Sequence, residues 1–196
     1  FFYKDGEWLS EIVFLDKDRV EVKFLNKIKE STNTSNIELA ICLVKKSPME
    51  NILQKATELG VSKIIPLISE RTEVKELNHD RARKIIIEST EQSNQMAPPE
   101  ILKTIKLKDF LQNLDGTTKI FFADTNSKYH LKNEKLKDFK SVCILIGPEG
   151  DFSPSERESI LSISEVTSFS MSKNILRSDT AVISAISLVN FINNHP

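Results

Sequence analysis

The sequence predicts an α/β protein built around a parallel sheet, with a short antiparallel β segment before it. From residue 37 onward, apolar runs of strand length alternate with helical segments, a pattern typical of parallel sheets. Before residue 31, apolar and polar side chains alternate as they do in half-buried strands. The 196 residues, 39% of them hydrophobic, suffice for one domain of ordinary size with a small appendage.

The N-terminal segment predicts a meander of about three strands. Residues 7–14 and the strictly alternating residues 20–24 indicate two of them, and residues 1–3 indicate a third. Three strands cannot close a barrel, and an isolated meander is only marginally stable. We therefore expect other residues to complete this unit.

A run of small polar residues at 30–36 separates the two patterns. We place the domain boundary there, which gives a β domain at 1–35 and a second domain at 36–196. The sequence has no internal repeat and no low-complexity tract.

The second domain opens with a β–helix–β unit. The apolar runs at 37–44 and 61–68 predict two buried strands. Between them, Ser47 suits a helix cap, Pro48 the first helical position and Glu50 the acid of a capping box. A unit of this kind places its two strands parallel to each other.

Strands and helices continue to alternate up to the last residues. Four further strands are expected, at 101–105, 119–123, 141–146 and 166–170. A helix is expected at 80–96, a short one ends near residue 116, and Ser153 opens another with the same cap signature as the first helix. The final helix, at 178–193, is apolar on most faces, so we expect it to be buried all round or to pack against a second subunit.

The charge of the chain excludes a histone-like blanket of positive charge. Twenty-seven Lys and Arg residues nearly cancel 28 Asp and Glu residues, which gives a net charge of −1. Any nucleic acid must therefore be bound by local basic clusters, unless these are merely solvated helix faces. The candidates are Lys45-Lys46, Arg71 and Arg81-Arg83-Lys84.

The remaining composition limits the cellular setting. No run of 18 apolar residues and no signal peptide occurs in the sequence, so we expect a cytoplasmic protein without a membrane partner. Cys42 and Cys143 lie in separate apolar runs, which favours buried thiols in a reducing compartment. No Cys/His spacing suits zinc, so no metal is expected.

One loop between a predicted strand and a capped helix is a candidate ligand site. Residues 146–152 contain two of the five glycines of the chain, which suggests close approach of the backbone to a ligand. Glu149 and Asp151 would repel a phosphate, so a neutral or cationic ligand fits better. A tight strand–helix turn is the alternative.

A second loop, at 171–181, contains Ile175 and Leu176 between polar neighbours. These side chains either anchor the core or wall a planar ligand whose polar edges meet the backbone. In the second case Arg177 lies at the mouth of the same pocket, and otherwise it is a solvated or ion-paired charge.

The two loops read Ile-Gly-Pro-Glu-Gly at 146–150 and Ile-Leu-Arg-Ser-Asp-Thr-Ala at 175–181. Together they closely resemble the RsmE-type 16S rRNA uridine-N3 methyltransferases of the SPOUT superfamily. Three further segments are similar to that family in the same order, at 54–61, 66–72 and 88–93. Residues 1–30 resemble the later strands of the family's N-terminal PUA-like β-barrel.

The resemblance implies an α/β SPOUT fold with a parallel sheet and a C-terminal trefoil knot, after a partial PUA-like β-barrel at 1–35 that binds RNA. It implies S-adenosylmethionine as the methyl donor, with no metal. The protein would be a homodimer, and its substrate would be a uridine of 16S rRNA, in the small ribosomal subunit.

The resemblance also implies roles for individual residues. The cofactor pocket would be lined by Ile146, Gly147, Pro148, Gly150, Met171, Ser172, Ile175, Leu176, Thr180 and Ala181. Glu91, Gln92 and Arg71 would contact the substrate. Arg177 would stabilise the uracil anion, because a guanidinium stays protonated and can bind a carbonyl oxygen. Asp179 and Glu149 are candidate proton acceptors, and helix capping is the alternative role for both.

The sequence departs from the family pattern at several positions. Asp151 replaces a glycine, Met171-Ser172 replaces Leu-Gly, and Asp179 replaces the commoner Glu. Gln95 stands where the family often has Arg, which brings substrate affinity into question. Two alternatives stay open from the residues: a SPOUT methyltransferase that acts on tRNA, and a catalytically silent RNA-binding protein of the same fold.

Overall fold

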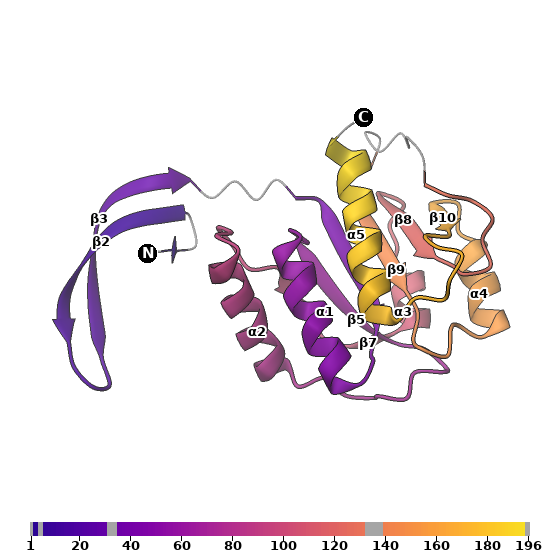
Figure 1. Cartoon of the computed structure of the whole chain (residues 1–196), viewed down its shortest axis with the longest axis horizontal. Coiled ribbons are helices and arrows are strands. Elements are labelled where there is room, and N and C mark those ends of the chain that lie inside the picture. Colours follow the sequence, from indigo (N-terminus) through magenta and orange to yellow (C-terminus); the bar gives the residue numbers. More distant parts are fainter. Residues whose placement is uncertain (1, 4–5, 31–34, 132–138, 195–196) are drawn as a thin grey trace.

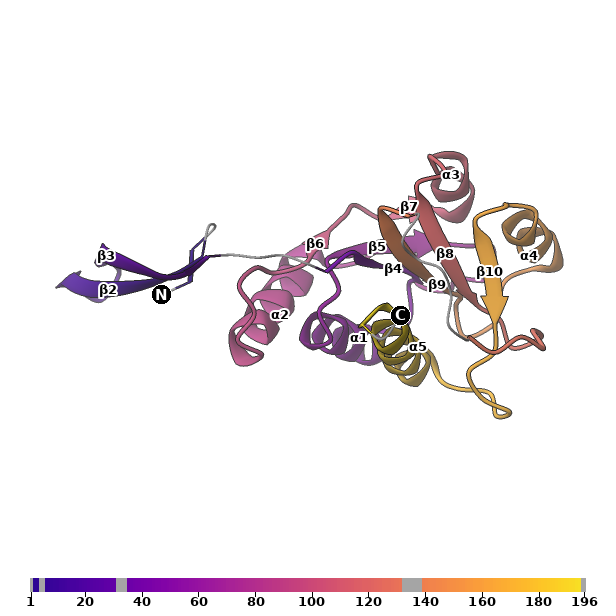
Figure 2. The ribbon, with the colours of Figure 1, turned by 90° about the horizontal axis from the view of Figure 1, so that it is seen from above.

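The computed structural model describes residues 2–3, 6–30, 35–131 and 139–194. Within them the chain forms two separate sheets. The N-terminal sheet extends away from the rest of the molecule, as both views show (Figures 1 and 2).

The N-terminal sheet has three antiparallel strands, as the alternating pattern predicts. They are β1 (Phe2–Tyr3), β2 (Gly6–Leu15) and β3 (Val20–Glu30), in that order. The ring of Trp8 packs 5.6 Å from that of Phe24. Ile12, Leu15 and Ile28 are nevertheless 59% to 70% exposed, so this sheet alone leaves a large apolar surface in water.

The second sheet has seven strands in the order β10-β8-β9-β4-β5-β6, with β7 also paired to β5, and every pairing is parallel. The predicted parallel α/β class is therefore confirmed. The strands are β4 (Ile37–Cys42), β5 (Lys63–Ile68), β6 (Glu100–Ile101), β7 (Ile105–Lys106), β8 (Thr118–Ala123), β9 (Ser141–Ile146) and β10 (Val166–Phe169).

Helices cover both faces of this sheet. One face is covered by α1 (Lys46–Glu58), α2 (His79–Gln92) and α5 (Ser178–Asn194), and the other by α3 (Leu107–Gln112) and α4 (Pro154–Leu161). Figure 2 shows the two layers of helices on opposite sides of the strands. Each face has its own apolar cluster, and successive residues of β4 alternate between the two, as the period of a strand requires.

The two cysteines are buried and free, as predicted. They lie in the middle of the sheet, Cys42 at the end of β4 and Cys143 in the neighbouring β9. Burial raises the pKa of the Cys42 thiol to about 12, and it raises the pKa of Cys143 as well. Both thiols therefore stay protonated at neutral pH and are poor nucleophiles.

The predicted cap of the first helix is wrong. The helix begins at Lys46, one residue before the expected Ser47 cap, and its N-cap residue, Lys45, forms no side-chain cap hydrogen bond. Glu50 does not reach back to the helix start, because its carboxylate binds Arg81 of α2 at 3.2 and 3.4 Å. Pro48 is tolerated because its missing N–H falls in the first turn.

Two further boundaries differ from the predictions. Helix α2 ends at Gln92 and not near the prolines, because the Ser93 hydroxyl donates to carbonyls of its last turn and Asn94 adopts a φ of 53°. The strand expected at 101–105 is split into β6 and β7, which pair with different parts of β5.

Candidate functional site

A cavity of about 460 Å³ lies at the carboxyl ends of the neighbouring strands β10, β8 and β9. Open parallel sheets bind ligands at this edge, and the volume is in the range of small-molecule pockets. The loops at 123–125, 146–151 and 169–179 form most of the lining, with Pro48 and Ala181 from the helical layer. Both loops that the sequence singles out therefore meet around one cavity.

The loop after β9 is shaped by packing beneath it. Phe152 is 4% exposed, and its ring lies 5.6 Å from that of Phe122 in the core. A Cβ atom on Gly147 would come within 3.1 Å of the Phe152 ring. A side chain at Gly147 would therefore press on the Phe152 ring, which favours glycine at this position, and the sequence alone did not reveal this reason.

Asp151 adopts a left-handed backbone conformation with a φ of 59°. Its N–H donates to the carbonyl of Pro148 at 3.0 Å, and its carboxylate accepts the N–H of Phe152 at 2.8 Å. Aspartate tolerates this conformation better than most residues, although glycine adopts it most easily. A glycine, which the family usually has at this position, would adopt the same left-handed backbone conformation as Asp151.

The loop after β5 forms hydrogen bonds with the loop after β9 and with the helix α4 that follows it. The Arg71 guanidinium donates to the carbonyl of Gly150 at 3.0 Å, and the N–H of Glu70 donates to Glu156 of α4 at 2.8 Å. A Cβ atom on Gly150 would meet Arg71 at 3.7 Å, which is an ordinary contact. Arg71 is exposed and is not among the residues that line the cavity.

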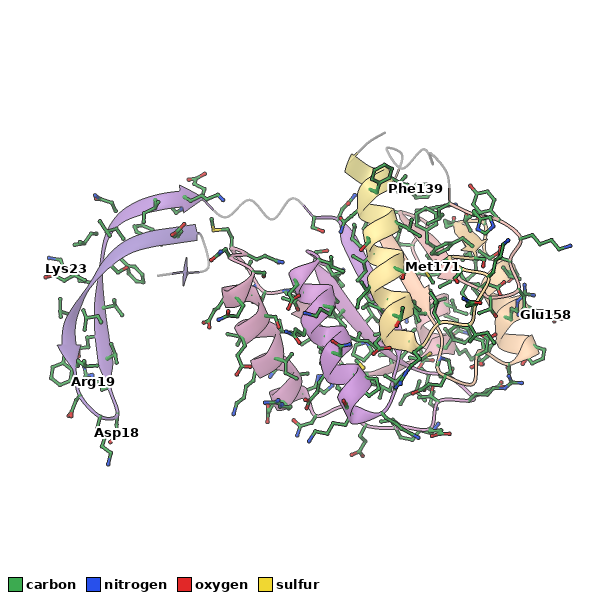
Figure 3. The ribbon with its side chains drawn as sticks, viewed as in Figure 1. Asp18, Arg19, Lys23, Phe139, Glu158 and Met171 are labelled. Carbon is green, nitrogen blue, oxygen red and sulfur yellow. The ribbon has the colours of Figure 1, made fainter. Side chains whose placement is uncertain are left out.

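The loop at 170–177 is held by the segment after β8. The N–H of Ser170 donates to the carbonyl of Tyr129 at 2.8 Å. The carbonyl oxygen of Ser170 lies 2.9 Å from Nδ1 of His130. Because a carbonyl oxygen can only accept a hydrogen bond, this ring nitrogen must carry the proton. Ile175 is 90% exposed at the cavity rim, whereas Leu176 is half-buried against the core. Figure 3 labels Met171 within this loop.

Sequence reasoning missed the wall formed by Ala123, Asp124 and Thr125. The Asp124 side chain is completely buried and accepts two hydrogen bonds from Arg157 of α4, at 3.2 and 2.7 Å. This ion pair ties the loop after β8 to the helix that follows the loop after β9. The one available signal was that Asp124 directly follows a strand of the same parallel sheet.

The three predicted catalytic residues all line the cavity. Arg177 and Glu149 are exposed, and neither side chain has a hydrogen-bond partner within the described residues. The Asp179 carboxylate is half-buried and accepts the N–H of Thr180 at 3.0 Å and the amide of Asn51 at 3.2 Å. The cavity therefore presents a guanidinium that is available to a ligand and a carboxylate that is fixed in place.

Nine of the ten residues predicted to hold the cofactor line the cavity, and Thr180 does not. Of the predicted substrate contacts, Glu91 is exposed and lines neither cavity described here, while Gln92 lines a second groove between α1 and α2. The Gln95 amide donates to the carbonyls of Thr57 and Glu58, so it closes the carboxyl end of α1.

The charges around the cavity have a clear bias. Among the described lining residues, Arg177 is the one cation; of the four acids, Asp124 is neutralised by Arg157, which leaves Glu149, Asp151 and Asp179. Such a lining suits a ligand with positive charge better than a phosphate. Within the described ranges, no group of three or more His, Cys, Asp or Glu side chains could hold a metal ion. No helix within these described ranges is long and apolar enough to cross a membrane.

Comparison with known proteins gives consistent results. The model of an RNA methyltransferase domain matches residues 30–190. The ribosomal RNA small subunit methyltransferase E of Rickettsia conorii is 32% identical over 194 residues, which cover 97% of this chain and 79% of that protein. The protein of the same name from Aquifex aeolicus is 30% identical over 182 residues, covering 90% of this chain and 78% of its own length.

Two solved structures have a similar fold over most of this chain. A ribosomal RNA small subunit methyltransferase E from Neisseria gonorrhoeae, bound to S-adenosyl methionine, gives a TM-score of 0.85 at 26% identity and covers 96% of this chain and 80% of its own. A putative methyltransferase from Legionella pneumophila, in complex with SAM, gives 0.78 at 28% identity, covering 96% and 79%.

Proposed function

Because this chain belongs to the RNA methyltransferase family that includes ribosomal RNA small subunit methyltransferase E, we propose that it methylates N3 of a uridine in 16S rRNA, with S-adenosylmethionine as the methyl donor. The observation that carries the proposal is the cavity at the strand ends, where the two motif loops meet. We expect the reaction in the cytoplasm, on RNA of the small ribosomal subunit.

The residues at the cavity suit this cofactor. The backbone of 146–150, with Met171, Leu176 and Ala181, would hold its adenosine part between apolar walls and backbone polar groups. The acid-rich lining suits the positive charge of a sulfonium. When bound, the cofactor supplies an activated methyl group, so the chain's main task is to position donor and acceptor.

Uridine N3 carries a weakly acidic proton, which must leave before or as the new bond forms. Arg177 would bind the uracil carbonyl oxygen on which negative charge collects, because its guanidinium lines the cavity and has no partner within the described residues. Asp179 is the better placed candidate to accept the proton, since Asn51 holds its carboxylate at the cavity. Glu149, exposed and unpaired within the same residues, is the second candidate.

We propose two domains with different tasks. Residues 36–196 would carry catalysis, and their C-terminal part would form a trefoil knot. The path of the chain supports this: it reaches β10 at the sheet edge and then returns so that α5 packs against α1 and β9. Residues 1–35 would be part of a PUA-like barrel that binds RNA, and the exposed apolar surface of β2 and β3 supports such a completion.

Removal of the gene tests the proposed function directly. Mass spectrometry of nucleosides from small-subunit rRNA should show N3-methyluridine in wild-type cells and its loss in the deletion strain, with return of the nucleoside on complementation. If the amount of N3-methyluridine does not change, the substrate assignment is wrong. A loss confined to tRNA would instead support the alternative substrate.

We further propose that the protein is a homodimer. The last helix leaves Leu188 39% and Phe191 63% exposed, and Ile183 is only half-buried, so an apolar strip of α5 faces outward. Light scattering at micromolar concentration should give about twice the chain mass of 22.3 kDa. A stable monomer that still methylates RNA would contradict this proposal.

A further inference from the structure

A second groove, of about 340 Å³, runs between helices α1 and α2. Three carboxamides line it: Asn51 and Gln54 from α1 and Gln92 from α2. Gln54 and Gln92 are exposed, and neither has a hydrogen-bond partner within the described residues. Each carboxamide presents two N–H donors and a carbonyl acceptor, which is the pattern that recognises the edge of a nucleobase.

The groove adjoins the cavity described above. Asn51 belongs to the groove and Asp179 to the cavity, and the hydrogen bond of 3.2 Å between them forms part of the wall that the two share. Pro48 lines the cavity, and Glu50, two residues later on the same helix, lines the groove. The groove and the cavity are therefore neighbours, which makes the groove a candidate site for a nucleotide next to the one at the cavity.

The groove also offers an apolar side and a stacking surface. Ile85, 7% exposed, contributes its apolar side chain to the lining. The Arg81 guanidinium binds Glu50 through two of its nitrogens, at 3.2 and 3.4 Å, and its side chain remains 50% exposed. A two-nitrogen contact of this kind uses the edge of the guanidinium plane and not its faces, and an aromatic base stacks on a face.

The acids of the groove argue against a phosphate. Glu50 and Glu88 both line it, and Arg81, its one described cation, is already paired with Glu50. This ion pair also lowers the pKa of Glu50, which keeps that carboxylate charged at neutral pH. A base or a ribose hydroxyl meets no such repulsion, and an unpaired RNA base is commonly recognised by amide contacts together with stacking on arginine.

From these observations we propose that the groove between α1 and α2 binds an unpaired nucleobase of the RNA next to the methylated uridine, and that Gln54 and Gln92 recognise its edge. The inference rests on the proposed function. Gln54 and Gln92 would therefore determine which RNA segment is methylated and would take no part in the chemical step.

The test uses Gln54→Met and Gln92→Met in the full chain, because methionine has a similar length, lacks the amide and favours helices. Gln112→Met is the matched control, since Gln112 is an exposed glutamine on α3, on the other face of the sheet. Small-subunit rRNA and small subunits from the deletion strain serve as substrates. Methylation in single turnover at saturating cofactor is measured together with RNA binding.

Each groove variant should raise the RNA concentration for half-maximal rate roughly 10-fold, the scale of one lost base contact. The maximal rate and the affinity for S-adenosylmethionine should stay within about 2-fold, and Gln112→Met should match the wild type. The slope of log affinity against log salt should not change, whereas loss of a phosphate contact would lower it by about one.

Unchanged RNA dependence in both variants would overturn the inference. A lower salt slope would overturn it too, because the groove would then bind phosphate. If the variants instead lose the dimer in light scattering while RNA binding is retained, the groove belongs to a subunit contact. A wild type that binds RNA without methylating it would refute the proposed function, while the binding measurements would still decide the role of the groove.

Discussion

Gly147→Val should reduce the affinity for S-adenosylmethionine by roughly 100-fold, equivalent to about 3 kcal/mol. A Cβ atom at this position would lie 3.1 Å from the Phe152 ring, and valine adds two more carbons to it. Phe152 cannot give way easily, because it is buried and packs against Phe122. The loop at 147–151 must then move, and with it the wall of the proposed cofactor site.

Isothermal calorimetry measures this affinity, with a chelator present to show that no metal is needed. Gly150→Ala is the matched control, since a Cβ atom there would meet Arg71 only at 3.7 Å and more. We expect its affinity to stay within a few-fold of wild type. Gly147→Ala, with the smaller side chain, should lie between the two and should remain folded. Normal cofactor binding by folded Gly147→Val would mean that this loop does not shape the cofactor site.

The sequence Ser-Pro-x-Glu occurs at the start of two helices, and a comparison of the two shows when such a local signal predicts a helix cap correctly. At Ser153 the capping box forms as predicted: the Ser153 hydroxyl accepts the N–H of Glu156, and the Glu156 carboxylate accepts the N–H of Ser153. At Ser47 the same sequence forms no capping box, because Glu50 binds Arg81 from a helix some 30 residues later in the chain. A cap signature is therefore reliable only where no distant partner competes for its acid.

The site shows a similar division. Glycines and an apolar pair among polar residues were enough to find the loops at 146–152 and 171–181, because these features are local. Asp124 was missed because its place depends on strand order: β8 lies between β10 and β9, and the sequence does not specify that order. The role of Gly147 was only half predicted, since the sequence showed the glycine but not the ring of Phe152 beside it.

The second large effect is expected for Arg177→Ala. Methylation in single turnover should fall roughly 100-fold or more, the scale for loss of one preorganised charge that stabilises a developing anion. Cofactor affinity should stay within a few-fold, because the exposed Arg177 side chain borders the cavity while backbone and apolar residues form its walls. The melting temperature should not change, because the guanidinium has no hydrogen-bond partner among the described residues.

Arg177→Lys should restore little activity, since a single ammonium cannot reproduce the two-pronged guanidinium contact with a carbonyl oxygen. Lys173→Ala is the matched control: Lys173 is an exposed cation of the same loop, does not line the cavity, and should be replaceable without loss of rate. If Arg177→Ala abolishes cofactor binding at an unchanged melting temperature, Arg177 belongs to the cofactor site. If it keeps a near-normal rate, Arg177 does not stabilise the uracil anion, and the proposed proton acceptor Asp179, held by Asn51, becomes the next residue to replace.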